Sequence, residues 1–196
     1  MILHYFRREE NMNIEKIRTI PLDKILVLDT ETTGVDAKAE VLQFSAIWAD
    51  GTGAANMYIK PSHTLEWPRA MAVNHISPGD VAMCPYMSEV KEKIETLLNA
   101  SKAIVGYNLP FDLGMLYHNG VELPKETDAE FIDLMVPFAE IYGEWSDYFD
   151  DYKWQKLITC AKYYGYQGDG WHDSLADTRA TLHCFKAMLE NGDLTK

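Results

Sequence analysis

The amino-acid sequence predicts a single α/β domain built on a mixed sheet, and the order of its segments carries this prediction. Three strand-like segments come first, at residues 25–29, 41–49 and 54–60, and helical and strand-like segments then alternate up to residue 190. Consecutive strands favour antiparallel pairing, whereas alternation favours parallel strands with helices packed on the sheet. A length of 196 residues fits one domain.

The opening strands have clear boundaries. Ile25 to Asp29 is a short apolar run followed by polar residues and Gly34, as is typical of a buried central strand. A second apolar run, Val41 to Ala49, leads into Asp50-Gly51 and then into a third run, Ala54 to Lys60. An Asp-Gly turn between two such runs indicates a hairpin, so we expect an antiparallel opening to the sheet.

The remaining elements follow from capping and periodicity. Ser77 to Asp80 has a serine N-cap, proline at the first helical position and an acid at the third, which favours the start of a short helix. We expect further helices where apolar residues recur at helical spacing and strands where short apolar runs lie between them. The predicted helices are Met87–Asn99, Pro110–His118, Trp154–Tyr164 and the long amphipathic Ser174–Glu190, and the predicted strands are Ala103–Tyr107 and Phe131–Met135.

Composition limits the possible functions. The formal net charge of −12 is the reverse of what a simple phosphate-binding protein carries, so any contact with nucleic acid must be local. The three cysteines are far apart and form no CxxC pair, which fits a reducing, cytoplasmic setting and excludes a zinc knuckle. No apolar run reaches the ~18–20 residues of a membrane span. We assign residues 1–24 to an N-terminal arm of unassigned role and residues 25–196 to one domain.

A first pair of acids follows the first predicted strand. Asp29 and Glu31 are two positions apart, so their side chains project to the same side of an extended chain. Crowded, partly buried carboxylates repel one another, and a divalent cation between them would keep both ionised. The alternative is that the two acids only begin a turn with the threonines and glycine that follow.

Two further polar clusters lie at predicted helix starts. Asn108 and Asp112 follow a strand, where they could serve as an N-cap and a first-turn acid. His172 precedes the last helix and Asp177 lies five residues later. Ser174 and Asp177 also match a capping box, which is the structural alternative for this segment.

Taken together, these segments resemble the DEDDh group of 3′-to-5′ exonucleases. The motifs are Leu28 to Gly34, then Asn108 with Phe111 and Asp112, then His172 followed five residues later by Asp177. This group includes oligoribonuclease and the proofreading exonuclease subunit of bacterial replicative DNA polymerase. A sister group carries tyrosine four residues before the last aspartate, a position that is Asp173 here. The resemblance implies an RNase H-like exonuclease fold, with a mixed sheet flanked by helices.

The resemblance also implies a two-metal site. Asp29, Glu31, Asp112 and Asp177 would hold two Mg²⁺ or Mn²⁺ ions, with Asp29 shared between them. Glu31 and Asp177 would serve the ion on the nucleophile side and Asp112 the second. Hard oxygen ligands suit these cations, and two ions can stabilise the attacking and leaving oxygens at phosphorus. His172 would be the general base, since a histidine pKa near 6.5 suits proton transfer at neutral pH.

The implied substrate is the 3′ end of single-stranded nucleic acid, with DNA favoured over RNA, cleaved to nucleoside 5′-monophosphates. A polymerase or another replication or repair protein is the implied partner, and no membrane is involved. Two alternatives stay open: a phosphodiesterase acting on small nucleotides, and a nucleic-acid-binding module on the same fold. By resemblance, the residues that hold the terminal nucleotide are Thr32, Thr33, Gly34, His75, Asn108 and Phe111.

Overall fold

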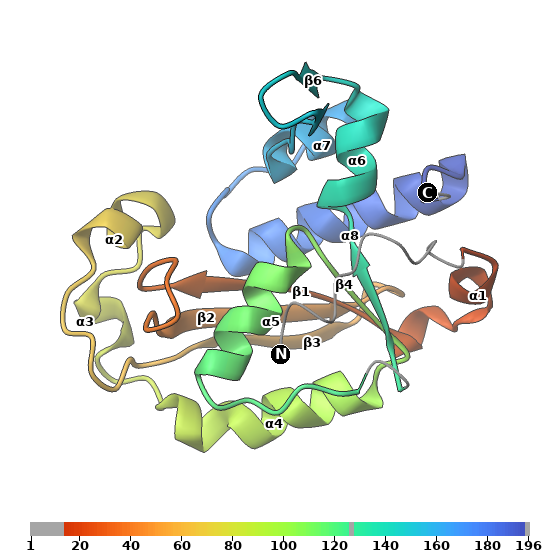
Figure 1. Ribbon diagram of the computed structural model, residues 1–196. Helices are drawn as coiled ribbons and strands as arrows, with labels where there is room; N and C mark the ends of the chain where they lie inside the picture. The colour runs from red at the N-terminus through yellow and green to blue at the C-terminus, as the bar shows by residue number, and fades with distance from the viewer. Residues whose placement is uncertain (1–13, 126–127, 195–196) are drawn as a thin grey trace.

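The computed structural model describes residues 14–125 and 128–194. Its centre is a five-stranded sheet in the order β3-β2-β1-β4-β5 (Figure 1). β1, β2 and β3 pair antiparallel, whereas β1, β4 and β5 run parallel. The predicted mixed sheet with an antiparallel opening is therefore confirmed. The strands are β1 Ile25–Thr32, β2 Val41–Trp48, β3 Gly53–Tyr58, β4 Ala103–Gly106 and β5 Glu130–Asp133.

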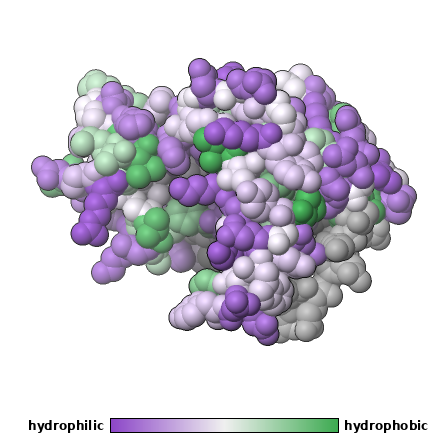
Figure 2. Space-filling model, turned by 90° about the horizontal axis from the view of Figure 1, so that it is seen from above, coloured by the Kyte–Doolittle hydropathy of each residue, from purple (hydrophilic) through white to green (hydrophobic). Residues whose placement is uncertain are grey.

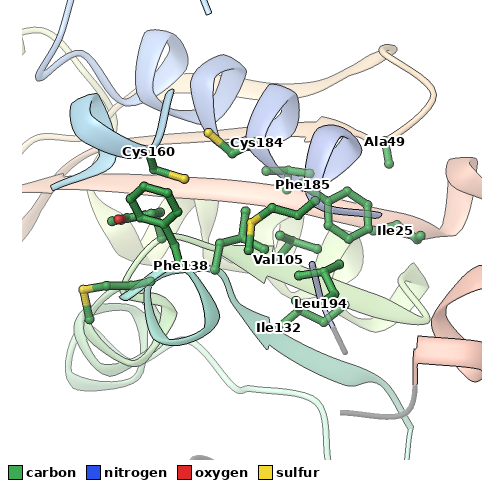
Figure 3. Close-up of a cluster of buried hydrophobic side chains, with 14 of the residues drawn as sticks. Ile25, Ala49, Val105, Ile132, Phe138, Cys160, Cys184, Phe185 and Leu194 are labelled. Atoms are coloured by element: carbon green, nitrogen blue, oxygen red, sulfur yellow. The ribbon is translucent and has the colours of Figure 1, made fainter. Parts of the chain in front are cut away.

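Helices cover both faces of the sheet, with α4 below it and α8 above it in the view of Figure 1. Alternate side chains of β1 face opposite ways, so Val27 joins one buried cluster while Leu26 and Leu28 join the other. Figure 3 shows the first cluster, in which Phe138 and Phe185 pack over the parallel strands. The main helices are α4 Met87–Ala100, α5 Leu109–His118, α6 Met135–Tyr142, α7 Leu157–Tyr163 and α8 Ser174–Asn191.

Shorter elements complete the fold. Residues 14–24, the described part of the predicted N-terminal arm, form α1 Ile14–Thr19 and the 3₁₀ turn η2 Leu22–Lys24. Ile17 of α1 is 1% exposed and belongs to the main core. Residues 1–13 lie outside the described residues, so the division of the chain at Lys24 stays a prediction. The segment between β3 and α4 contains α2 Pro68–Asn74 and α3 Pro78–Val81, and α3 has the predicted capping box.

Several predicted boundaries differ from the structure; the first strand, for example, extends past Asp29 to Thr32. The strand predicted over Phe131–Met135 ends at Asp133, because the Asp133 carboxylate accepts the Met135 N–H at 3.0 Å at the start of α6. The apolar pattern did not predict this helix. The helix predicted from Trp154 begins only at Leu157. A small hairpin precedes it, formed by β6 Trp145–Ser146 and β7 Asp151–Tyr152, and it stands above α6 and α7 in Figure 1.

The face of the described surface seen from above has no large continuous apolar patch. Figure 2 shows hydrophobic residues there as separate areas among hydrophilic and intermediate ones. Within residues 14–125 and 128–194, no helix is both long and apolar enough to cross a membrane. Cys160 and Cys184 are buried and Cys84 is partly exposed.

Candidate active site

Three of the four acids predicted to share a site meet near the carboxyl end of the central strand β1. β1 delivers Asp29 and Glu31 on the same side of the strand, and the first turn of α8 delivers Asp177. One ligand atom from each carboxylate lies within 4.8 Å of the other two. α8 packs on β1 and β2, so the fold brings together residues separated by almost 150 positions in the sequence. This spacing suits a shared cation.

Asp112 approaches from the first turn of α5. Its Oδ1 accepts hydrogen bonds from the Thr30 N–H at 3.0 Å and the Thr30 hydroxyl at 2.7 Å. Thr30 lies between the two acids of β1, so this bond fixes α5 against the strand that carries them. Asp112 is itself buried, at 3% exposure.

A tight turn from β4 into α5 makes this approach possible. A Cβ atom on Gly106 would lie 2.9 Å from a Leu109 side-chain carbon, so the turn requires glycine there. Asn108 has a left-handed backbone with φ of 65°, which asparagine tolerates. The Asp133 carboxylate accepts the Asn108 N–H at 2.8 Å. The predicted N-cap bond from the Asn108 side chain is not formed.

Burial raises the pKa of every acid in the cluster, and repulsion from neighbouring carboxylates raises it further. Burial is the main cause for each. The pKa of Asp29 is raised well above its ordinary value, with Asp112 and Asp177 adding repulsion. The pKa of Glu31 rises to about 8, with Asp177 as its main charged neighbour. The pKa values of Asp112 and Asp177 rise to about 7 and about 6. Without a counter-charge the cluster therefore resists full ionisation at neutral pH.

The donor set fits a divalent cation. Asp177 Oδ1 is buried and has no hydrogen-bond partner among the described residues. A buried acceptor without a partner is costly, and a bound cation would satisfy it. The other donors are carboxylate oxygens, the ligands that Mg²⁺ and Mn²⁺ prefer. We conclude that the residues present suit a hard cation.

His172 lies beside this cluster, in the loop before α8. Its side chain is exposed, its backbone is left-handed with φ of 69°, and its N–H donates to Asp177 Oδ2 at 3.3 Å. The capping box of Ser174 and Asp177, the structural alternative for this segment, is not formed, because Asp173 is the N-cap of α8. The Asp177 carboxylate is therefore not used as a cap and stays available to the site.

Several of the residues predicted to hold the terminal nucleotide have structural partners of their own. The Thr32 hydroxyl donates to the Gly34 carbonyl at 2.5 Å, and Thr33 pairs with Glu40 through its N–H and its hydroxyl. His75 and Asn108 are exposed. Phe111 is partly buried against the second hydrophobic cluster, and Gly34 is partly exposed beside Thr33.

Two site residues were missed. Asn74, at the end of α2, donates to the Thr32 carbonyl at 3.2 Å, and its side chain also hydrogen-bonds Glu31, which lowers the pKa of that acid. The sequence places Asn74 beside His75 in the segment that resembles the family's nucleotide-holding segment, but its bond to Thr32 could not be predicted because Thr32 lies 42 positions away. Asp133 organises the turn into α5. It ends an apolar run as Asp29 does, and that shared pattern could have found it.

The fold and the carboxylate cluster define a nuclease-like hydrolase, and the sequence comparison gives its family. The model of the RNase_T exonuclease family matches residues 26–185. The chain belongs to this exonuclease family, and its four acids and one histidine place it in the DEDDh type.

Two curated relatives support the assignment. An uncharacterised exonuclease, CP81, of Escherichia phage 186 is 28% identical over 87% of this chain and 90% of its own length. A DNA polymerase III subunit epsilon-like protein of Rhodobacter capsulatus is 27% identical over 86% of this chain. The match covers only 24% of that second relative, so most of it has no counterpart in this chain.

Solved structures confirm the RNase H-like exonuclease fold. The nuclease domain of 3′hExo, a DEDDh family member bound to rAMP, is 16% identical, with a TM-score of 0.62 over 89% of this chain and 96% of that one. Exonuclease X in complex with 5′ overhanging duplex DNA is 18% identical, with a TM-score of 0.58 over 88% and 99%. The predicted fold is therefore confirmed.

Proposed function

We propose that this chain is a 3′-to-5′ exonuclease that removes nucleoside 5′-monophosphates from single-stranded nucleic acid, with DNA favoured over RNA. The convergence of Asp29, Glu31 and Asp177 within 4.8 Å carries the proposal. We assign the reaction to one domain over residues 25–196, since the family match lies within it.

The four acids would hold two Mg²⁺ or Mn²⁺ ions, with Asp29 shared, Glu31 and Asp177 on the nucleophile side and Asp112 on the other. Such ions supply positive charge for the attacking and leaving oxygens of an in-line displacement. Support comes from the partnerless Asp177 Oδ1 and from carboxylate pKa values that are raised where no cation balances them.

His172 is the proposed general base. Its imidazole takes a proton from the attacking water, whose oxygen forms a new bond to phosphorus. The bond between phosphorus and the 3′ oxygen of the preceding nucleotide then breaks, and that oxygen acquires a proton from solvent. His172 suits this role because its side chain is exposed while its N–H is bonded to Asp177.

Binding of the terminal nucleotide is assigned to residues after β1 and at the ends of α2 and β4. Asn74 ties the α2 segment to the Thr32 carbonyl, so His75 and Thr33 lie on segments that are joined beside the cluster. Asn108 and Phe111 lie at the start of α5, the helix that carries Asp112. The proposed nucleotide-binding set is Thr32, Thr33, Gly34, His75, Asn108 and Phe111.

Polarity and partners draw support from related proteins. Structures similar in fold include one of a full-length 3′-exonuclease, with a TM-score of 0.66 and 15% identity. The epsilon-like relative supports a polymerase, or another replication or repair protein, as the partner.

Degradation of 5′-labelled single-stranded DNA and RNA tests this function. The reactions contain Mg²⁺, Mn²⁺ or chelator, with Asp29→Asn as the control. A metal-dependent ladder that shortens from the 3′ end, absent in the variant, is expected. Cleavage of dinucleotides alone would instead indicate a small-nucleotide phosphodiesterase, and binding without any cleavage would indicate a nucleic-acid-binding module.

A further inference from the structure

Asp173, the neighbour of the proposed general base, connects three elements of the fold. Its Oδ1 accepts the N–H groups of Leu175 and Ala176, each at 3.1 Å, and so caps α8. Its Oδ2 accepts from Gln43 Nε2 of β2 at 2.9 Å. The Tyr58 hydroxyl of β3 also hydrogen-bonds Asp173. Oδ1 thus bonds the first turn of α8, and Oδ2 bonds Gln43 of the sheet.

Gln43 is a rigid anchor for this contact. It is 1% exposed, and its Nε2 also donates to Asn56 Oδ1 at 3.2 Å. Its Oε1 accepts the Ser174 N–H at 3.2 Å. In the β ladder Gln43 lies opposite both Glu31 and Tyr58. The contact therefore ties the start of α8 to the strand position beside a proposed metal ligand.

The chain around His172 is held at three points. The Asp173 N–H donates to the Gly170 carbonyl at 3.2 Å, and the His172 N–H donates to Asp177 Oδ2. The Gln43 contact fixes the next side chain along. His172 is exposed and has a left-handed backbone. Among the described residues its ring has no hydrogen bond that would fix its direction. Its direction depends on the residues beside it.

We propose that Asp173, anchored by Gln43, is a positioning residue that directs the His172 imidazole toward the attacking water. This inference rests on the proposed role of His172 as the general base. Loss of a hydrogen bond that orients a reacting group costs about 10–100-fold in rate.

Asp173→Asn separates positioning from capping. Asparagine caps helices about as well as aspartate, so Oδ1 can keep its bonds to Leu175 and Ala176. Its amide NH₂ would then face the Gln43 NH₂, two donors with no acceptor between them. We expect kcat on a single-stranded oligonucleotide to fall about 10–100-fold, with KM, melting temperature and the Mn²⁺ concentration for half-maximal rate unchanged.

Two variants control this result. Asp50→Asn removes an equivalent charge from the exposed turn after β2 and should leave kcat unchanged. Gln43→Met breaks the same contact from the other side while the Asp173 charge remains. It also removes the Gln43 bonds to Ser174 and Asn56, so it should lower kcat at least as much as Asp173→Asn does. A fall in kcat for Asp173→Asn alone would point to its charge and overturn the positioning role.

The decisive test repeats Asp173→Asn in the His172→Ala background. If Asp173 acts through His172, the second substitution should cause no further loss of kcat. An equal loss in both backgrounds, or no loss in the otherwise native chain, would overturn the inference. An unchanged rate for His172→Ala alone would refute the general base itself and the inference with it, so the two failures are distinguishable.

Discussion

Asp29, Glu31 and Asp177 crowd together near the carboxyl end of the central strand β1, whereas Glu144, Asp147 and Asp150 lie exposed on and beside the β6–β7 hairpin. In the first group burial raises each pKa and neighbouring acids raise it further. In the second, hydrogen bonds from Lys153 and Gln155 lower the pKa of Glu144. Acids that are far apart in the sequence but meet in a buried cluster favour the binding of a cation. A dense run of acids in solvent does not, because water already stabilises each charge.

The largest effect should follow loss of the shared ligand. Asp29→Asn is expected to lower kcat by about 10³-fold, because a bound cation contributes several kcal/mol to the transition state. The melting temperature of the metal-free protein should stay the same or rise, since one repelling carboxylate is removed. Single-turnover kinetics measures the loss of rate, and thermal unfolding measures the melting temperature. Retained turnover would refute the site.

A smaller loss is expected from the proposed base. His172→Ala should lower kcat by about 10²-fold, the usual contribution of a positioned general base. Metal binding should persist, since the four carboxylates remain. Calorimetric titration with Mn²⁺ measures this directly. Lost Mn²⁺ binding would assign His172 to the metal site instead of to proton transfer.

The sheet and the main acids were predictable because both depend on local patterns. Ile25 to Asp29 is a buried run followed by spaced acids, and such a run fixes a central strand whatever it pairs with. The α6 helix was missed because Met135 continues the apolar run of β5, and only the Asp133 side chain separates the two elements. Runs of this length are ambiguous between strand and helix.

Residues that act through long-range contacts could not be predicted. The roles of Asn74 and Gln43 arise from partners 42 and 130 positions away. The capping box at Ser174 is not formed for the same reason. Ser174 instead forms a 2.6 Å hydrogen bond with the Ser45 hydroxyl on β2, and Asp173 takes the cap.

The buried acids should make the stability of the metal-free protein depend on pH. Glu31 ionises near 4.5 in an unfolded chain and at about 8 in the fold. Between these values unfolding releases protons, so the free energy of unfolding should fall as pH rises, by on the order of 2 kcal/mol. Chemical denaturation from pH 5 to 8 measures this fall. Saturating Mg²⁺ should reduce it. Glu31→Gln should make it smaller but not abolish it, because the pKa values of Asp112 and Asp177 are also raised. A free energy of unfolding that rises over this range would contradict the raised pKa.

The smallest effect should come from the hairpin. Asp147→Asn and Asp150→Asn together remove two exposed charges, and asparagine suits the left-handed backbone of Asp150, where φ is 51°. We expect the free energy of unfolding to change by less than about 0.5 kcal/mol, as for other exposed substitutions. Its dependence on pH should match that of the native chain, and kcat at 0.15 M salt should be unchanged, since exposed charges are screened within about 8 Å. A lower kcat would show that the hairpin acids act on the site, and the contrast between the two acidic regions would then not hold.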